Sequence, residues 1–219
     1  MSTEWLQPVN FPSADLGIVQ EVFDNLDGHD VLSDSQTMIE IMLRAVPVFV
    51  ARGISGTTVN HLINASGVSR RTFYKYYAGK SAVLEHIYRA GGRLFVTRLD
   101  QIISRTSCVD SLVEESVGLF FEHHASIGSL ILLLEEEAMR RDSPLAAMRQ
   151  KIYDQVASRL KVAIADRQPS PPDTMVLYTL IWTMESASLN LMRDQRYSMD
   201  DINRVKKVVV HILKSSLTG

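Results

Sequence analysis

The stretch TTVNHLINASGVSRRTFYKYYAGK, residues 57–80, decides the fold of this chain. It predicts two short helices joined by a tight turn. Thr57 is expected to cap the first helix, and Ser69 to cap the second, which runs to about Tyr77. Between the helices, Gly67 can adopt the left-handed backbone that a sharp corner requires. Two helices joined in this way are typical of a helix-turn-helix.

The second of these helices has two different faces. Val68, Phe73 and Tyr77 fall on an inner face at helical spacing. The outer face combines cations, hydroxyls and aromatic rings: Arg70, Arg71, Thr72, Tyr74, Lys75 and Tyr76. These chemical groups suit a helix that lies in the major groove of DNA. The alternative is an ordinary helical hairpin with a charged, solvated face.

The run GVSRRTFYKYYAGKSAVL, which begins at Gly67, resembles the helix-turn-helix of the tetracycline-repressor (TetR) family of regulators. The resemblance covers about residues 35–95, and it departs from the family pattern at Ser66, Tyr76 and Pro47. It implies an all-α fold, in which a three-helix DNA-binding head is joined to a helical-bundle body. In the family, that body binds ligand and forms the dimer.

The resemblance also implies which side chains contact DNA. Carried over by position, the phosphate contacts fall on Thr58, Thr72, Tyr74, Tyr76 and Lys80. The base contacts fall on Arg70 and Arg71, with Lys75 as a further cation on the same helix and Tyr74 able to touch a thymine methyl group. An arginine fork matches the two acceptors of guanine, so we expect a guanine in each half-site. The alternative is that both arginines bind only phosphate.

Charge is distributed unevenly along the chain. The net charge is −2, which taken alone argues against a nucleic-acid partner. Residues 1–34, however, carry seven acids and no Lys or Arg, whereas residues 35–98 carry nine Lys or Arg and two acids. Local charge sets the attraction to phosphates, and the basic block coincides with the predicted helix-turn-helix.

We expect three parts in chain order: an acidic extension (1–34) with a short amphipathic helix at about Ser13–Leu26, a helix-turn-helix domain (35–80), and a helical ligand-binding and dimerisation domain (81–219). The first helix of the head should begin after a capping pattern at Ser33, bend at Pro47 and end at Gly53. The extension is expected to dock either on the body or the partner subunit, or on the flank of the basic head.

The body should contain about six helices. They are expected at Lys80 to about Ser104, from Asp110, over LILLLEEEAMRR, from Pro144 to Asp166, from Asp173 to about Asp194, and from Ser198 to about Ser216. In the first of them, the pair Gly91-Gly92 indicates either a hinge or close packing against a neighbour.

Composition and motifs argue against several other classes of protein. No apolar run has the length of a membrane span, no signal peptide is visible, and the single cysteine excludes an intrachain disulfide, so we expect a cytoplasmic protein. No glycine-rich phosphate loop or Ser-His-Asp arrangement is present, which argues against an enzyme. Neither His123-His124 nor Glu135-Glu136-Glu137 forms a chelate, because adjacent helical side chains diverge by about 100°. We therefore expect no metal or cofactor.

The three consecutive glutamates have a simpler interpretation. They are expected to form a solvated face, on which Glu135 or Glu136 pairs with Arg140.

The resemblance implies a ligand pocket in the body. The candidates for its wall are aromatic, thioether or polar side chains of the predicted body helices: Phe120, Phe121, His124, Met139, Met148, Tyr153, Tyr178, Trp182 and Glu185. Each of them could instead belong to the core or to a dimer interface. Glu185 is a single charge in an apolar helix, and its alternative is a solvent-facing or cross-dimer position.

Together these patterns predict a ligand-responsive transcriptional regulator, with a repressor expected. It would bind a palindromic operator as a dimer, formed through helices 173–194 and 198–216, and leave it on binding a small apolar or amphipathic effector. One alternative is a regulator of the same fold without a small effector. Another is a helical-bundle enzyme or small-molecule carrier.

Overall fold

The computed structural model describes residues 36–170, 172–193 and 198–217, and within these ranges all regular secondary structure is helical. The acidic segment 1–34, with the helix predicted at Ser13–Leu26, lies outside the described residues. The helices are α2 (Gln36–Gly56), α3 (Val59–Ser66), α4 (Arg70–Tyr76), α5 (Lys80–Arg105), α6 (Val109–Ile127), α7 (Ser129–Ala138), α8 (Pro144–Ala165), α9 (Thr174–Arg193) and α10 (Met199–Leu217). The all-α prediction is confirmed.

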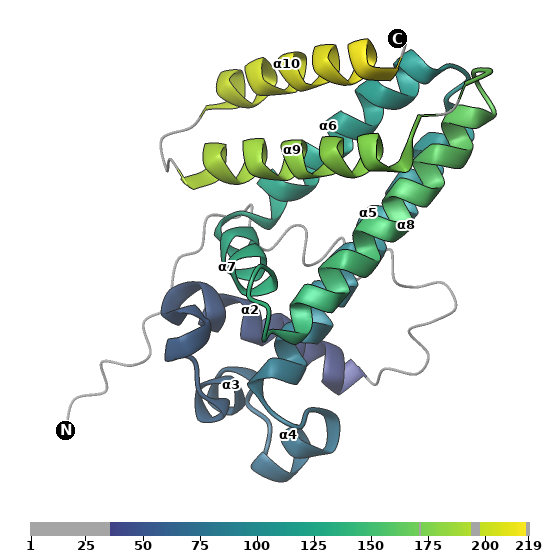
Figure 1. Cartoon of the computed structure of the whole chain (residues 1–219). Coiled ribbons are helices and arrows are strands. Elements are labelled where there is room, and N and C mark those ends of the chain that lie inside the picture. The colour runs from purple at the N-terminus through teal and green to yellow at the C-terminus, as the bar shows by residue number, and fades with distance from the viewer. Residues whose placement is uncertain (1–35, 171, 194–197, 218–219) are drawn as a thin grey trace.

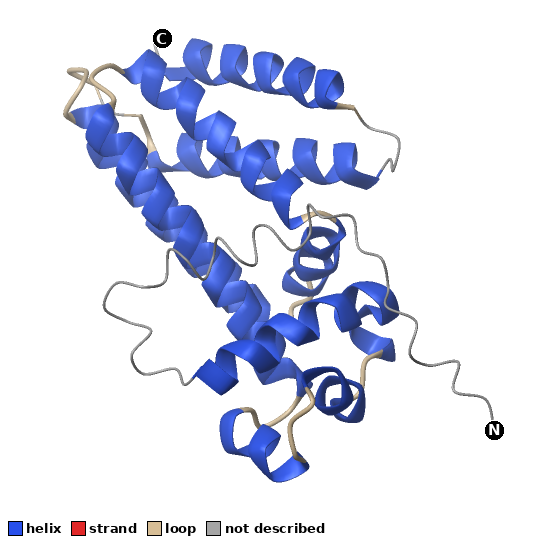
Figure 2. Ribbon diagram, turned by 180° about the vertical axis from the view of Figure 1, so that it is seen from behind, coloured by secondary structure: helices blue, strands red, loops and turns tan. Residues whose placement is uncertain are grey.

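The helices are arranged between two ends of an elongated molecule (Figure 1). Helices α2, α3 and α4 form one end, and α9 and α10 lie together at the other. The long helices α5 and α8 run side by side between these ends in both ribbon views (Figures 1 and 2), and short α7 lies between α2 and α9.

The break in α2 lies at Gly53 and not at Pro47. The backbone keeps helical angles through Pro47, and the non-helical residue inside the element is Gly53, with φ 66° and ψ 170°. These backbone angles do not measure the bend expected at Pro47, which stays a prediction. The predicted end at Gly53 marks the break itself, after which one further turn reaches Gly56.

Two of the predicted helix caps are shifted by one or two residues. Thr58 caps α3, because its Oγ1 accepts a bond from the His61 amide, whereas the Thr57 hydroxyl is buried and donates to the Gly53 carbonyl. Helix α6 begins after Cys108, so Asp110 lies inside its first turn and does not cap it. The caps predicted at Ser69 and Ser198 are confirmed, and Gly67 has the left-handed φ of 69° that the corner requires.

The buried apolar side chains form two clusters, and the boundary between them does not follow the end of the head. One cluster joins α2, α3 and α4 to the first half of α5, and it also includes Leu130, Leu134 and Ala138 of α7 and Leu145 of α8. The other joins the second half of α5 to α6, α8, α9 and α10. The head therefore shares its core with α7 and with the start of α8.

Close packing explains one glycine of the α5 pair. A Cβ atom on Gly92 would lie 2.3 Å from Cδ1 of Ile152 in α8, whereas a Cβ on Gly91 would meet nothing within 4 Å. The absence of a side chain at Gly92 lets α5 and α8 approach each other. Of the two interpretations of this pair, the structure supports packing at Gly92.

Among the described residues, no single helix is long and apolar enough to cross a membrane. Helices α6 and α7 pass such a test only as a pair, and they are bent by 104° at the break between them.

Candidate nucleic-acid interface and ligand cavity

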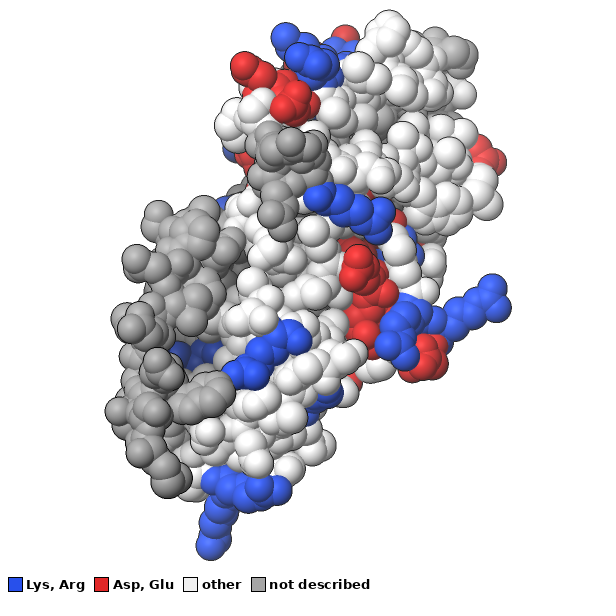
Figure 3. Space-filling view, turned by 90° about the vertical axis from the view of Figure 1, so that its left-hand side faces the viewer, with Lys and Arg blue, Asp and Glu red and all other residues white. Residues whose placement is uncertain are grey.

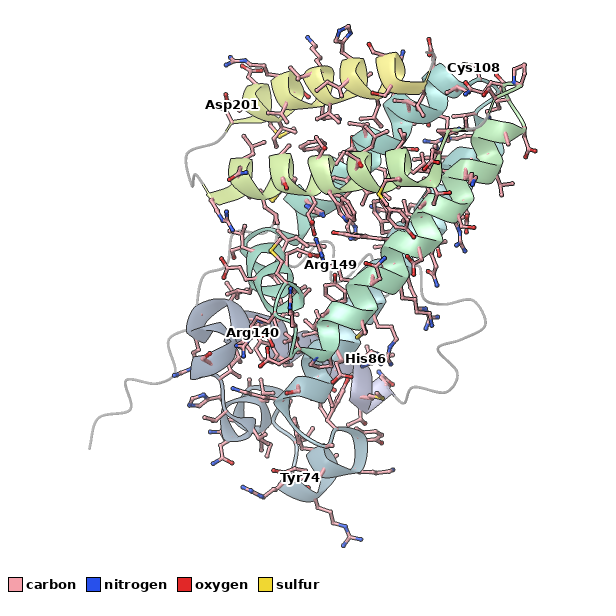
Figure 4. The ribbon with its side chains drawn as sticks, viewed as in Figure 1. Tyr74, His86, Cys108, Arg140, Arg149 and Asp201 are labelled. Carbon is pink, nitrogen blue, oxygen red and sulfur yellow. The ribbon has the colours of Figure 1, made fainter. Side chains whose placement is uncertain are left out.

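The recognition helix α4 presents its polar face to solvent, as the sequence predicts. Phe73 and Tyr77 are buried and anchor it, whereas Arg70, Arg71, Tyr74 and Lys75 are exposed. Tyr74 lies at the far end of the head (Figure 4). Thr72 and Tyr76 are half-buried beside these groups. The helix thus offers guanidinium, hydroxyl and aromatic groups on a surface that nothing else in the described chain covers.

Arg70 is partly oriented by its neighbours. Its Nη1 donates to Oδ1 of Asn60 in α3 at 3.1 Å, and its guanidinium lies 5.5 Å from the ring centre of Tyr74. Asn60 was not among the predicted site residues, because a partner ten positions away across a turn leaves no periodic signal in the sequence. Arg71 has no such restraint among the contacts described.

Lys80, which is predicted to contact a phosphate, is bonded to backbone carbonyls of the head. Its ammonium donates to the backbone carbonyls of Ile54 at 2.7 Å, Ser55 at 3.4 Å and Thr57 at 2.8 Å. These carbonyls follow the break in α2, so the lysine ties the connection between α2 and α3 to the start of α5. A phosphate contact by Lys80 would have to compete with these bonds.

The charged side chains of the head are mostly basic. Between residues 36 and 98 the chain has nine Lys or Arg side chains and two acids, Glu40 and Glu85. On the face drawn in Figure 3, the lower end of the molecule shows basic side chains without acidic ones, whereas basic and acidic side chains both lie in the middle and at the top. Phosphate attraction is therefore concentrated at the end that carries α4.

A cavity of about 120 Å³ lies where head and body meet. Its wall is mainly apolar and comes from α2, α5, α6, α7, α8 and α9. Met42 and Val46 of α2 form part of it, next to Ile87 and Tyr88 of α5. A molecule in this cavity would contact a helix of the DNA-binding head directly.

The cavity contains some of the predicted ligand residues and leaves out others. Phe120, His124 and Tyr153 line it, and Glu185 hydrogen-bonds to Tyr153 just behind the wall. The other five do not line this cavity. Phe121 is fully buried in the body core, Met148 packs against the head cluster, and Met139, Tyr178 and Trp182 lie away from the cavity.

Two of those five have clear alternative roles. The Tyr178 hydroxyl donates to Asp154 at 2.6 Å, and its ring stacks on Trp182, whose side chain is 42% exposed. Trp182 is one of five exposed large apolar side chains on α9 and α10, the others being Met175, Met199, Val208 and Ile212.

A buried cluster of charges adjoins the cavity, whose wall includes Glu135, Tyr88 and Tyr153. Arg149 of α8 lies between two carboxylates, Glu185 of α9 and Glu135 of α7 (Figure 4 labels the arginine). Its Nε donates to Oε1 of Glu185 at 2.8 Å, and the same nitrogen lies 3.3 Å from Oε2 of Glu135. The hydroxyl of Tyr153 donates to Glu185, and that of Tyr88 donates to Oε1 of Glu135 at 3.2 Å.

This cluster corrects the prediction for the glutamate run. Glu135 is 7% exposed and Glu185 is 3% exposed, so neither faces solvent, and Glu135 pairs with Arg149 and not with Arg140. Arg140 instead pairs with Glu137 and Asp142. Burial, reinforced by the charge of Glu185, raises the pKa of Glu135 to about 8. A lone carboxylate in an apolar helix should have indicated a buried cation, and Arg149 is that cation.

The two adjacent histidines are buried and neutral. Burial, and then the charge of Arg98, lowers the pKa of His123 to about 4; burial, and then His123, lowers the pKa of His124 to about 3. Nδ1 of His124 is hydrogen-bonded to the Ser188 hydroxyl at 3.0 Å. Within the described ranges no group of His, Cys, Asp and Glu side chains could hold a metal ion.

Three comparisons bear on this geometry. Residues 41–87 match the model of a family described as "Bacterial regulatory proteins, tetR family". A protein of Mycobacterium tuberculosis (strain H37Rv), named for a proposed role as the mycofactocin biosynthesis transcriptional regulator MftR, is 26% identical over 170 residues. That alignment covers 72% of this chain and 80% of the relative.

Solved structures of similar fold include two regulators named FadR, of which the Bacillus halodurans protein is described as a fatty acid degradation regulator. The Bacillus halodurans protein has a TM-score of 0.70 and 20% identity, and the match covers 82% of this chain and 95% of that one. The Bacillus subtilis protein, solved in complex with stearoyl-CoA, has a TM-score of 0.70 and 18% identity, with 82% and 98% covered. At these identities the likeness shows the fold.

Proposed function

Because this chain belongs to the tetR family of bacterial regulatory proteins, whose members regulate transcription and are not enzymes, we propose that it is a ligand-responsive repressor. It binds a palindromic operator as a homodimer and leaves the operator when a small apolar or amphipathic effector enters the body. It acts in the cytoplasm, where the operator DNA is. The carrying observation is the cavity whose wall includes both the head helix α2 and the body.

The proposed DNA contacts are made by α4. Its exposed Arg70 and Arg71 would reach base edges, and Thr58, Thr72, Tyr74, Lys75 and Tyr76 would hold the flanking phosphates. For Lys80 we propose a positioning role, because its ammonium is bonded to three carbonyls between α2 and α3.

The proposed dimer uses the outer face of α9 and α10. Five of the large exposed apolar side chains in the described chain belong to these two helices, and they include Trp182 at 42% and Val208 at 55% exposure. An apolar face of this kind is stabilised when it is covered, and two copies related by a two-fold axis would form a four-helix interface. The two heads would then read two half-sites about 34–36 Å apart or a multiple of that spacing.

Effector control follows from the shared wall of the cavity. A ligand that contacts Met42 and Val46 can favour one position of α2 relative to α5 and α7. Such a ligand shifts the equilibrium only if it binds the DNA-free arrangement more tightly. The alternative of a regulator without an effector is less favoured, because the body contains this cavity.

The structure of Bacillus subtilis FadR was solved in complex with stearoyl-CoA, which makes a fatty acyl compound a second candidate here. The apolar wall is compatible with an acyl chain. The buried cluster beside the cavity, however, contains two carboxylates and one arginine, and it offers little to an anionic group.

The test begins with selection of DNA sites by the full-length protein from a random pool. We expect inverted repeats, and we expect the selected site to shift in a gel as a single dimeric complex. A library of small apolar and amphipathic compounds is then screened for release of that DNA. Selection that yields no common sequence would contradict a sequence-specific regulator, and release by no compound would favour the version without an effector.

A further inference from the structure

The cavity wall contains polar atoms that have no hydrogen-bond partner. In the described part of the chain, three buried side-chain atoms lack one: Oγ of Ser116, Nδ1 of His123 and Oε2 of Glu135. All three residues line this single cavity. An unpaired buried polar group is costly, so such groups are usually explained by something that binds them.

Of these three atoms, Oε2 of Glu135 is the one that belongs to an acidic group and lacks a hydrogen-bond donor. The Nε–H of Arg149 is directed to Glu185, so Oε2 of Glu135 has an ion-pair neighbour at 3.3 Å without receiving a hydrogen bond from it. Arg149 thus supplies one positive charge for two buried carboxylates. The Tyr88 hydroxyl satisfies only the other oxygen, Oε1.

From this geometry, and on the basis of the proposed function, we propose that the effector is a small amine or related cation whose charged end pairs with Glu135 and whose apolar part fills the cavity. A ligand ammonium gives Oε2 a donor and supplies the second positive charge that the two carboxylates lack. The raised pKa of Glu135 agrees with a carboxyl group that lacks a full counter-charge.

The rest of the wall favours a compact aromatic or aliphatic body for this cation. Phe95, Phe120 and the rings of Tyr88 and Tyr153 line the cavity and can receive an apolar ring or the face of a cation. The volume of about 120 Å³ is similar to that of engineered apolar cavities, of about 150 Å³, that take up benzene. An anionic ligand would instead place a negative charge beside Glu185 and would offer Oε2 of Glu135 no donor.

The test uses three probes that share one ring and differ in charge: benzylamine, benzyl alcohol and benzoate. Binding to the full-length protein without DNA is measured by calorimetry at neutral pH. We expect benzylamine to bind about 10- to 100-fold more tightly than benzyl alcohol, and benzoate to bind most weakly. Glu135→Gln should remove the preference for the amine and keep the binding of the alcohol, which also reports that the cavity is intact.

The matched control is Glu136→Gln, which removes the same charge one residue along, from an exposed position. It should leave the order of the three probes unchanged. Benzoate binding as tightly as benzylamine, binding of none of the probes, or an unchanged amine preference in Glu135→Gln would each overturn the proposal. Because these measurements contain no DNA, their failure leaves the selection of operator sites intact, and the two proposals fail separately.

Discussion

Arg71 is the residue on which base recognition can be tested most directly. Its side chain is exposed on α4 and has no restraining contact of the kind that Asn60 gives Arg70. Arg71→Ala should cost about 1–3 kcal/mol of operator affinity and relax the preference at one position of each half-site. Lys75→Ala is the control, because its loss should weaken all sequences alike and reduce the salt dependence. Titration of a set of single-base operator variants checks this, and equal losses on all of them by Arg71→Ala would assign the arginine to phosphate.

Lys80 is expected to act on the shape of the head. Lys80→Ala removes three bonds to the carbonyls that follow the break in α2. We expect a lower melting temperature together with weaker DNA binding, because a buried or half-buried acceptor that loses its donor costs about 1–3 kcal/mol. Thermal unfolding compared with Lys75→Ala, which lacks such bonds, checks the role. Unchanged stability with a reduced salt slope would restore the phosphate contact that the family resemblance implies.

Glu135 should make stability depend on pH. The folded chain raises the pKa of this carboxyl from 4.5 to about 8, through burial and then through Glu185. Between these two values the folded state holds a proton that the unfolded state releases, so the free energy of unfolding falls as pH rises. The buried His123, with its pKa lowered from 6.5 to about 4, acts in the opposite direction and only below its unfolded value.

Glu135→Gln isolates this effect. The variant should gain melting temperature relative to the wild type as pH rises from about 6.5 to about 8.5, by roughly 2–4 °C for each kcal/mol of relative stabilisation. Circular dichroism melts of the two proteins, with Glu136→Gln as the exposed control, measure it. A constant difference across this range would mean that Glu135 is ionised throughout.

The residues that the sequence located well are those governed by local chemistry. Gly67 and Ser69 have the conformations that a tight turn and a helix cap demand, and Phe73 is buried as helical spacing predicts. Glu135 could not be located in the same way, because its burial depends on Arg149 in another helix. Three consecutive glutamates have the same sequence pattern whether or not one of them faces such a partner.

At the scale of elements, the contact between α5 and α8 depends on Gly92, which has no side chain. Gly92→Ala places a methyl group 2.3 Å from Cδ1 of Ile152, which also lines the cavity. We expect a cost of about 1–3 kcal/mol from overpacking. Gly91→Ala meets nothing within 4 Å and should instead stabilise α5 by up to about 1 kcal/mol.

Denaturant unfolding of the two alanine variants decides the question. The free energy of unfolding should fall in Gly92→Ala and rise in Gly91→Ala. Equal destabilisation by both substitutions would contradict the packing role of Gly92. A normal melting curve together with lost effector response in Gly91→Ala would point to the hinge that the sequence also allowed.

The helix boundaries of the body were largely predictable, because Pro144, Gly128 and the Ser198 cap interrupt the chain in ways that leave a local signature. The break in α2 also falls at a residue that the sequence indicated, Gly53, whose φ of 66° is one that glycine adopts readily. The sequence did not indicate that the helix resumes after this break and reaches Gly56.

At the scale of the whole molecule, the exposed apolar face of α9 and α10 should hold the dimer together. Val208→Glu puts a charge in the middle of this face and should give monomers at micromolar concentration, with operator affinity lost in parallel. Val162→Glu is the matched control, since Val162 is 60% exposed on α8 and outside the face. Sedimentation velocity measures both. A dimeric Val208→Glu would exclude this face as the interface.

The apolar cluster shared by α2, α3, α4, α7 and α8 limits how this protein can be rebuilt from parts. Leu130 and Leu134 of α7 belong to the same apolar cluster as the buried residues of α2, α3 and α4, so they also support the DNA-binding head. A chimaera that joins residues 36–80 to the body of a relative would pack the apolar surface of this head against α7 and α8 residues of another protein. A transplant that keeps operator choice and response together would have to carry α7 and the first turn of α8 along with the head.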